Sequence, residues 1–395
     1  MTVEDFAARE LAARRAAGLV RELRPIDGPQ DTWVTVDGHR ALLLCSNNYL
    51  GLANHPALRE AASRAAAEFG VGAGASRLIS GSMRLHHRLE EELAAFKQTE
   101  AALLFNSGYQ ANVGTIAALV GTDDIVFSDQ LNHASIIDGC RLSRARVFVY
   151  PHKDMTALAE LLARHAGRRR LIVTDSIFSM DGDVAPLGTI CDLALRHGAM
   201  VMVDEAHATG VVGPHGRGVV AAEGLGEQIT VQMGTLGKAF GVFGAFVAAR
   251  RSVIDHLINA ARSFVYTTAL PPPVVAAGLA ALDIIRREPR RRERLLDNAR
   301  TLAADLRSLG LDLGDAAGHI IPVIIGDSTR CMRLAQQLLG EGVFVQGIRP
   351  PTVPPGTARL RVTPMSTHTP ADLSHATGAF ERVVAASSNA NAHAG

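Results

Sequence analysis

One lysine lies in a glycine-rich segment, GTLGKAFG at residues 234–241. Lysines usually occupy solvated positions, so Lys238 is unusual among small residues that follow a predicted strand. Glycines on both sides let a bulky planar molecule approach the backbone closely. An amine held in an apolar pocket or beside other cations can lose its proton and attack an aldehyde, and Thr235 offers a hydroxyl to a phosphate. The segment by itself is weak evidence for this chemistry.

A second segment, DEAHATG, begins where an apolar run ends in Asp204 and is followed by His207. A carboxylate there can pair with a protonated pyridine nitrogen and make the ring a better electron sink. An isolated Asp-x-x-His is also explained by a helix cap and a structural histidine. The same letters spell the DEAH box of nucleic-acid helicases, which requires a G-x-x-x-x-G-K-[ST] loop upstream. The only Gly-Lys pair, Gly237-Lys238, lies downstream and precedes Ala239, so the helicase interpretation fails.

Three more segments put polar residues on loops after predicted strands. Ser107, Gly108 and Tyr109 open a helix, where backbone amides and the serine hydroxyl can cradle a phosphate; an ordinary capped turn also explains them. His133 in DQLNHASI can stack on a flat ring, although a lone histidine is more often structural, and Ser179 lies in FSMDGD. Because ligands bind at the C-terminal ends of parallel strands, one cleft can collect all these groups with Asp204 and Lys238.

The elements that must position these residues follow from the hydrophobic pattern. Six short apolar runs alternate with helical patterns between about residues 100 and 250: AALLF, DIVFSD, RVFVYP, RLIVTD, MVMVDE and GAFVAA. This alternation predicts parallel strands buried on both faces and linked by crossover helices. We therefore expect an α/β fold with a mainly parallel central sheet and helices on both faces.

Patterns outside this region predict smaller elements. The first two dozen residues predict an amphipathic helix ending near Pro25, and a strand pair is expected around the turn Asp37-Gly38. A long helical pattern at 272–310 precedes three strand-like runs of a smaller α+β domain, IIPVIIGD, VFVQGIRPP and ARLRVTP. The predicted regions are an N-terminal helix and arm at 1–45, a large domain at 46–285, a C-terminal α+β domain at 286–385 and a disordered tail at 386–395.

Composition excludes several classes of function. Lysine and arginine total 40 against 39 acidic residues, so no global charge attracts nucleic acid or membrane. No apolar run is long enough to span a bilayer, and the N-terminus lacks the apolar core of a signal peptide. The four scattered cysteines fit neither a disulfide framework nor a zinc site. His86, His87 and Glu90 suggest a metal only superficially, and we expect a solvated helix face there. A cytoplasmic protein without a metal follows.

The motifs together resemble the α-oxoamine synthase family over roughly residues 5–385. The matching segments, in the family's order, are SNNYLGL (46–52), SGYQAN (107–112), DQLNHASI (129–136), FSMDGD (178–183), DEAHATG (204–210), GRG (216–218) and GTLGKAFG (234–241). These are fold-type I enzymes that use pyridoxal 5'-phosphate to condense an amino acid with an acyl-CoA and release carbon dioxide. The resemblance implies an acyltransferase of that fold.

The resemblance also implies roles at the cofactor. Lys238 would bond covalently to the cofactor aldehyde, Asp204 would pair with the pyridine nitrogen, and His133 would stack on the ring. His207 and Ser179 would lie near the phenolic oxygen. Lys238, His133, Asp204 and His207 would then be the catalytic residues.

Further matches concern the phosphate and the substrates. Those implied to hold the phosphate are Ser107, Gly108, Tyr109 and Thr235, with Thr267 and Thr268 reaching it from the partner of a homodimer that shares its active sites. Asn47 and Arg361 match positions that orient the amino-acid carboxylate. Arg21 would meet the far carboxylate of a pimeloyl chain, although a solvated arginine is the alternative.

The segment IRPPTVPPGTARLRVT, residues 348–363, indicates a branch of the family. It is most similar to the branch that joins L-alanine to pimeloyl-CoA, or to a pimeloyl carrier protein, in biotin biosynthesis. The alternatives are 2-amino-3-ketobutyrate CoA ligases, which use glycine and acetyl-CoA, then 5-aminolevulinate synthases and serine palmitoyltransferases. A protein of another class, a non-catalytic regulatory homologue, is also an alternative.

Overall fold

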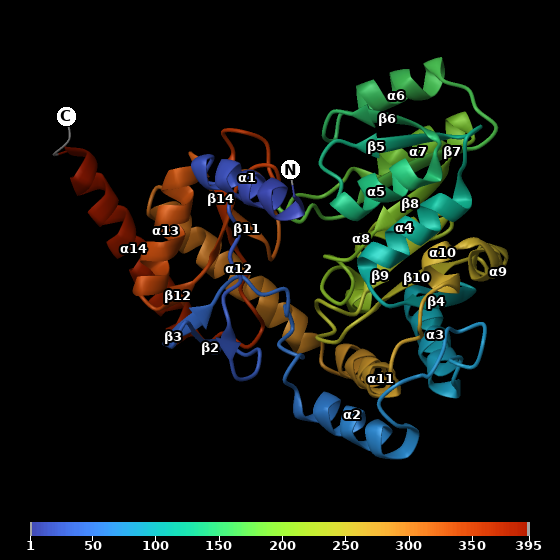
Figure 1. The fold of residues 1–395 in the computed structure, drawn as a ribbon, viewed down its shortest axis with the longest axis horizontal. Helices are drawn as coiled ribbons and strands as arrows, with labels where there is room; N and C mark the ends of the chain where they lie inside the picture. The colour runs from blue at the N-terminus through green and yellow to red at the C-terminus, as the bar shows by residue number, and fades with distance from the viewer. Residues whose placement is uncertain (1, 393–395) are drawn as a thin grey trace. The chain divides into compact units, whose positions relative to one another are not determined.

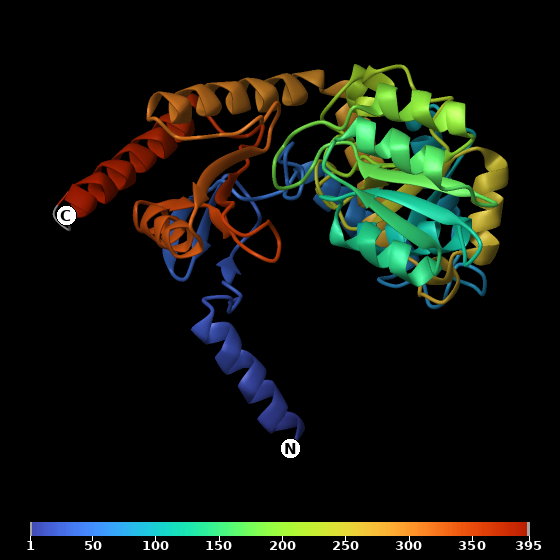
Figure 2. The same cartoon turned by 90° about the horizontal axis from the view of Figure 1, so that it is seen from above.

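The computed structural model describes residues 2–392 of the 395-residue chain. The chain divides into two compact units (Figures 1 and 2). Unit 1 contains the residues up to Ser46, the short segment Met180–Gly182 and the residues from Leu295 onward. Unit 2 contains Asn47–Ser179 and Asp183–Arg294. Each unit is described by itself.

Unit 2 is built on a seven-stranded sheet. In spatial order the strands are β4 (Ala101–Phe105), β10 (Ala245–Ala249), β9 (Val231–Thr235), β8 (Met200–Asp204), β7 (Arg170–Asp175), β5 (Ile125–Asp129) and β6 (Arg146–Tyr150). The expected mainly parallel sheet is confirmed, but β10 runs antiparallel to both neighbours. The expectation that GAFVAA is a parallel strand was wrong, because only residues 236–244 join β9 to β10. A parallel crossover needs a dozen or more residues.

Helices cover both faces of this sheet (Figure 2). One face carries α4 (Gly108–Leu119), α5 (Ala134–Ser143), α9 (Arg251–Ala260) and α10 (Arg262–Val265). The other carries α3 (Arg84–Lys97), α6 (Met155–Arg164), α7 (Leu187–His197) and α11 (Pro272–Arg287), and α2 (Pro56–Phe69) packs on α11. The split follows from right-handed crossovers, since the chain moves outward from β4 to β6 and back from β6 to β8.

Two short elements of unit 2 lie in the connection between β8 and β9. They are the 3-10 turn η1 (Pro214–Gly216) and α8 (Val219–Ala222). The strands themselves are buried along their whole length in most cases, as expected for a sheet covered on both faces. Polar side chains at the strand ends are therefore held by a rigid, desolvated scaffold.

Unit 1 combines the two ends of the chain. Its four-stranded sheet has the order β1 (Ile26–Asp27), β2 (Trp33–Val36), β3 (His39–Leu43) and β12 (Val343–Phe344). The expected hairpin turns at Asp37 and Gly38, which both have positive φ. A second, antiparallel sheet has the order β11 (Ile321–Gly326), β14 (Ala358–Val362) and β13 (Gln346–Ile348), beside α13 (Ser328–Gly340) and α14 (Pro370–Ala392). Because β12 pairs with β3, the N-terminal arm groups with the C-terminal segments.

Three helical expectations differ from the structure. Helix α1 (Val3–Ala16) ends well before Pro25, and it buries none of its residues. The pattern at 272–310 forms α11 and α12 (Pro289–Ser308), because proline disfavours a helical residue before it. Helix α14 reaches Ala392, so residues 386–392 are helical where a disordered tail was expected, and 393–395 lie outside the described residues. Within residues 2–392, no helix has the length and apolar character needed to cross a membrane.

Candidate active site

Three aspartates end neighbouring strands of the unit 2 sheet. Asp129 ends β5, Asp175 ends β7 and Asp204 ends β8. Asp175 and Asp204 are register partners, and all three side chains are nearly inaccessible to solvent. Three buried acids at one sheet edge are costly unless hydrogen bonds or cations compensate them. Their partners therefore define the site.

Asp204 is a buried carboxylate held by neutral donors. Asn112 Nδ2 donates to its Oδ2 at 2.7 Å, and the Ala206 amide donates to its Oδ1 at 2.8 Å. Across the part of the chain that the structure describes, Asp204 forms no ion pair. A buried anion without a countercharge is a good partner for a protonated ring nitrogen. The donor set at Asp204 thus fits a pyridinium group.

The same Asn112 amide links Asp204 to His133. Asn112 Nδ2 also donates to Ser135 Oγ at 2.9 Å, and Ser135 Oγ lies 2.7 Å from His133 Nδ1. The Ser135 amide donates to the same Nδ1, so His133 caps α5. Burial lowers the pKa of His133, and the Lys238 charge lowers it further against the opposing effect of Asp204. His133 is therefore a neutral, oriented ring at neutral pH.

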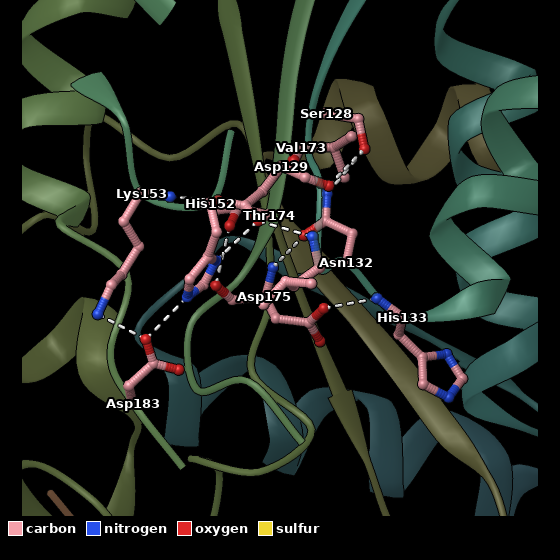
Figure 3. A network of polar contacts seen from close by, with 11 residues as sticks. Ser128, Asp129, Asn132, His133, His152, Lys153, Val173, Thr174, Asp175 and Asp183 are labelled. Atoms are coloured by element: carbon pink, nitrogen blue, oxygen red, sulfur yellow. Dashed lines mark hydrogen bonds and ion pairs between the residues drawn. The ribbon is translucent and has the colours of Figure 1, made fainter. Parts of the chain in front are cut away.

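Asp175 supports the segment that leads into His133. Its Oδ2 accepts the His133 amide at 2.8 Å, as Figure 3 shows, and its own amide donates to Asn132 Oδ1 at 3.0 Å. Burial and the neighbouring Asp204 charge raise the pKa of Asp175 well above its usual range. This raised pKa favours the protonated form of Asp175 beside the Asp204 carboxyl.

Lys238, on the loop between β9 and β10, begins a chain of hydrogen bonds. Its Nζ lies 2.7 Å from His207 Nε2, and His207 Nδ1 lies 2.7 Å from the Tyr49 hydroxyl. Because Tyr49 donates its single proton to Asn47 Oδ1 at 3.0 Å, it must accept from His207 Nδ1. His207 Nε2 then carries the free lone pair, and Lys238 donates to it. This arrangement fixes the position of the amine.

The other lysines of the chain are in ion pairs. The sequence contains three lysines, Lys97, Lys153 and Lys238. Lys97 is fully buried against Glu205, and Lys153 Nζ pairs with Asp183 at 2.5 Å. A carboxylate partner stabilises the charged form of an amine, whereas a neutral imidazole does so less. Lys238 Nζ contacts the His207 imidazole, and its glycine-rich segment leaves room for an aldehyde to approach.

The residues expected to hold a phosphate lie at the start of α4 and beyond β9. Ser107 caps α4 by accepting the Gln110 amide at 3.2 Å, which leaves further amides of the first turn directed outward. Thr235 ends β9, where its hydroxyl donates to the Gly244 carbonyl at 3.0 Å. The Tyr109 hydroxyl instead donates to Asp138 of α5 at 2.7 Å, so that hydroxyl already has an acceptor.

Thr267 and Thr268 lie beside the same helix start in their own chain. Asn106 Nδ2 donates to Thr267 Oγ1 at 3.2 Å and to the Thr268 carbonyl at 2.8 Å. Thr268 also forms an isolated β-bridge with Ser76. The next residue before them, Tyr266, is 73% exposed. The segment therefore combines fixed backbone with an exposed aromatic side chain.

Two predicted substrate residues belong to unit 1. Arg361 lies on β14 with 6% of its surface exposed. Burial raises the pKa of the nearby Cys45 thiol to about 12, although the positive charge of Arg361 acts to lower it. Arg21 lines a pocket of about 460 Å³ formed by residues 19–24 and the β13 region. Arg349 also lines this pocket and donates to the Val20 carbonyl at 2.6 Å. Guanidinium groups beside apolar walls suit a ligand with an apolar chain and a carboxylate end.

Ser179 immediately precedes the segment Met180–Gly182 that groups with unit 1. Within unit 1, Arg359 forms an ion pair with Asp181, and a Cβ at Gly182 would overlap the Ile320 carbonyl. Gly182 also has a positive φ of 70°, which favours glycine. The turn after Ser179 is therefore tightly fixed.

The expected solvated face was wrong for His86 and Glu90, whereas His87 is exposed. His86 is fully buried and its Nε2 bonds the Leu270 carbonyl at 2.8 Å. Glu90 is also buried and accepts two hydrogen bonds from Arg77 at 2.8 and 2.9 Å. The helix α3 packs this face against β4 instead of water. No cluster suited to a metal ion occurs among the described residues.

Sequence reasoning missed four polar partners in this site: Tyr49, Asn112, Ser135 and Asp175. Tyr49 and Asn112 lie inside the motifs SNNYLGL and SGYQAN, so their positions carried a signal. Ser135 follows His133 by two residues, a spacing that permits a local side-chain bond. Asp175 ends an apolar strand as Asp204 does, and that parallel could have identified it.

Comparison with known proteins adds independent observations. Residues 40–380 match the family described as aminotransferase class I and II. The 8-amino-7-oxononanoate synthase of Citrifermentans bemidjiense is 53% identical over 379 residues, which cover 95% of this chain and 97% of that protein. The enzyme of the same name from Geobacter metallireducens is 54% identical over 372 residues, covering 93% and 95%.

Solved structures resemble the chain over nearly its full length. Serine palmitoyltransferase from Sphingomonas wittichii matches with a TM-score of 0.94 and 34% identity, covering 98% of this chain and 99% of that one. The S. paucimobilis serine palmitoyltransferase with bound pyridoxal phosphate and myriocin matches with a TM-score of 0.92 and 34% identity, covering 97% of each. An 8-amino-7-oxononanoate synthase from Francisella tularensis matches with a TM-score of 0.76 and 28% identity, covering 88% and 98%.

Proposed function

This chain belongs to the class I and II aminotransferase family, and we propose that it is an α-oxoamine synthase that makes 8-amino-7-oxononanoate. The reaction joins L-alanine to the pimeloyl thioester of CoA or of a carrier protein and releases carbon dioxide and the thiol, in biotin biosynthesis. The observation that carries the proposal is the Lys238–His207 contact together with the buried Asp204, which forms no ion pair among the described residues. The two relatives of that name from Citrifermentans bemidjiense and Geobacter metallireducens are 53% and 54% identical over nearly the whole chain, against 34% for the serine palmitoyltransferase from Sphingomonas wittichii.

The residues present fit pyridoxal 5'-phosphate. Asp204 supplies the charge for its ring nitrogen, Lys238 the amine for its aldehyde and His133 a flat neutral ring to stack on it. Ser107, Gly108 and Tyr109 at the start of α4, with Thr235, are proposed to hold its phosphate, and Ser179 to bond its phenolic oxygen. When bound, the cofactor supplies an aldehyde for the amino group and a ring that stabilises negative charge at the α-carbon.

The chain's own groups then move protons. The Lys238 amine would take the α-proton of alanine and later return a proton to the product. His207 would hold Lys238 through its Nε2, because Tyr49 accepts from its Nδ1. His133 is proposed to donate from Nε2 to the thioester carbonyl or the carboxylate. Asn47 and Arg361 are proposed to orient the alanine carboxylate.

Arg21 is proposed to bind the distal carboxylate of the pimeloyl chain. We expect Arg21→Ala to raise KM for pimeloyl-CoA about tenfold to a hundredfold, which corresponds to losing one charge-assisted hydrogen bond. KM for alanine should change little, because alanine does not reach this group. Steady-state kinetics with each substrate varied in turn measures the effect.

Arg14→Ala is the matched control for this test. Arg14 is an exposed arginine near the end of α1, so its removal should leave both KM values unchanged. If Arg14→Ala and Arg21→Ala behave alike, the assignment of Arg21 is wrong and the arginine is a solvated side chain.

We also propose a cytoplasmic homodimer with shared active sites. Tyr266 and Ile79 are 73% and 80% exposed, and they flank the Ser76–Thr268 bridge. Large apolar side chains exposed together are typical of protein–protein contacts. Thr267 and Thr268 would then reach the phosphate bound in the partner. The molecular mass in solution, measured by sedimentation, tests the dimer.

A substrate panel tests the proposed reaction. Purified, cofactor-loaded protein is given alanine with pimeloyl-CoA, glycine with acetyl-CoA or succinyl-CoA, and serine with palmitoyl-CoA. We expect the first pair alone to release CoA and carbon dioxide at a substantial rate, with the ketone product identified by mass. Turnover of another pair would assign the chain to a different branch. Cofactor binding without turnover of any pair would indicate the non-catalytic homologue.

A further inference from the structure

His152 lies between two buried carboxylates behind the site (Figure 3). Its Nδ1 is 2.9 Å from Asp129 Oδ1, and its Nε2 is 2.8 Å from Asp183 Oδ2. A carboxylate can only accept, so both ring nitrogens must donate. His152 is therefore an imidazolium, and its charge offsets two acids that come from different loops.

The charged surroundings of His152 favour this form. Burial of the ring works against its charge, but hydrogen bonds and charges from Asp129 and Asp183 raise the pKa of His152 to about 9. Lys153, the next residue, pairs with Asp183. Tyr150 at the end of β6 is near Asp129, and burial and that charge raise its pKa, so it stays neutral. The Phe178 ring packs edge-on against the His152 ring, with 4.4 Å between the two ring centroids.

The contact of His152 with Asp129 is connected to His133 through the loop after β5. Asp129 accepts the Leu131 amide and the Lys153 amide, both at 2.9 Å, which folds the loop after β5. Asn132 follows and fastens that loop to β7 through the Val173 carbonyl at 2.8 Å and the Asp175 amide. His133 comes next, with its amide on Asp175. The position of the His133 ring thus depends on where Asp129 is held.

The contact of His152 with Asp183 is connected to Ser179 through the loop after β7. The Asp183 carbonyl accepts the Phe178 amide at 3.0 Å, and Ile177 bridges to Val184, so the loop after β7 closes on itself. Ser179 is the first residue of that loop beyond Phe178. Asp183 therefore holds both ends of the short loop that carries Ser179.

We propose that His152 is a positioning residue, whose imidazolium ties the loop that carries His133 to the loop that carries Ser179 and so aligns both side chains on the cofactor. The expected effect of His152 on kcat rests on the proposed function. His152 lies outside the residues that touch the cofactor or substrate. The proposed role also gives a reason for the charges of Asp129, His152 and Asp183 near the site.

The test compares His152→Gln with the wild type as cofactor-loaded protein. Glutamine is neutral, so it cannot satisfy two carboxylates at once. We expect kcat near neutral pH to fall about tenfold, as small displacements of catalytic groups cause, and the visible spectrum of the bound cofactor to shift. In the wild type, kcat and the spectrum should change in a step near pH 9, where His152 loses its proton. This step should be absent from His152→Gln.

Two further variants sharpen the result. Asp183→Asn removes one of the two acids, so the step should move below the wild-type pH. His152→Arg keeps a charge at every pH, and it should restore kcat relative to glutamine and lack the step. His256→Gln is the matched control, because His256 is an exposed histidine that bonds the Ala118 carbonyl. It should leave kcat, the spectrum and the step as in the wild type.

A stability measurement separates positioning from support alone. A histidine whose pKa is raised on folding stabilises the fold fully below its unfolded pKa, and this contribution is lost as pH rises through about 9. A glutamine variant with a lower Tm but the wild-type kcat, spectrum and pH step would overturn the proposal. So would a step that Asp183→Asn does not move. If the wild type fails to join alanine to pimeloyl-CoA, the proposed function fails, whereas the spectra still decide the role of His152.

Discussion

Replacement of Lys238 by alanine is expected to abolish turnover together with the visible absorbance of the protein-bound cofactor. The amine provides both the covalent link to the aldehyde and the group that moves the α-proton. Proton transfer by a placed side chain usually contributes about 10² to 10⁴-fold, so turnover should fall at least that far. The other residues around Asp204 remain, and the variant should still fold.

The three lysines of the chain supply an internal control for this experiment. Borohydride reduction of the loaded protein should attach the cofactor to the peptide that contains Lys238. Lys97 and Lys153 should stay unlabelled, because each is paired with a carboxylate. Peptide mass spectrometry measures the labelled position directly.

Small amines provide a second control. A primary amine added to Lys238→Ala should restore part of the turnover by replacing the missing proton-transfer group, whereas sodium chloride at equal ionic strength should not. Lys238→Arg keeps the charge but does not lose its proton, so it should be as inactive as alanine. If Lys238→Ala keeps its absorbance and turnover, another residue binds the cofactor, and the proposed function must be abandoned.

The sheet and the positions of the chemical groups could be predicted because both depend on local pattern. Continuous apolar runs such as RLIVTD and MVMVDE have few stable environments other than a covered sheet. Their polar last residues, Asp175 and Asp204, then fall at one edge. Lys238 was identifiable because a charge in a glycine-rich segment is rare.

The direction of β10 and the grouping of β3 with β12 depend on pairings that no local pattern contains. The pairing of Val343 with Leu42, for example, joins residues from opposite ends of the chain. Helix α1 shows the same limit, because its sequence has helix-forming residues and a capping box, yet it buries nothing. Propensity predicts that a helix forms, and tertiary contacts decide how far it extends.

The hydrogen-bond partners of polar residues such as Asn112 and His152 could not be predicted for a related reason. An asparagine or a histidine has many possible bonds, and its partner is decided by the fold in three dimensions. His152 looks like an ordinary loop residue until Asp129 and Asp183, 23 positions before it and 31 positions after it, are placed on either side.

A buried ion pair gives the largest expected effect on stability. Lys97 and Glu205 are fully buried, and Lys97 also donates to the Arg217 carbonyl at 2.5 Å. Glu205 accepts the Val220 amide at 3.0 Å, and a Cβ at Gly218 would overlap its carboxylate. This explains the GRG segment as packing. The pair joins α3 to the loop that follows Asp204.

Lys97→Met is expected to lower the free energy of unfolding by about 3–5 kcal/mol, because it leaves the Glu205 charge buried without a partner. Urea unfolding of the cofactor-loaded protein measures this loss. Arg64→Met removes a cation from a pair with Glu60 in which both side chains are about two-thirds exposed, so it should cause little change.

The double variant Lys97→Met with Glu205→Leu separates the two causes of the loss. If unpaired charge dominates, removal of both partners should recover most of the stability, since an apolar pair of similar size often replaces a buried ion pair well. Recovery should stay incomplete, because the Val220 amide and the Arg217 carbonyl each lose a hydrogen bond. A double variant no more stable than Lys97→Met would mean that these backbone bonds, and not the charge, hold the loop after Asp204. The pair would then act through those backbone hydrogen bonds, which fix the loop that begins at Asp204.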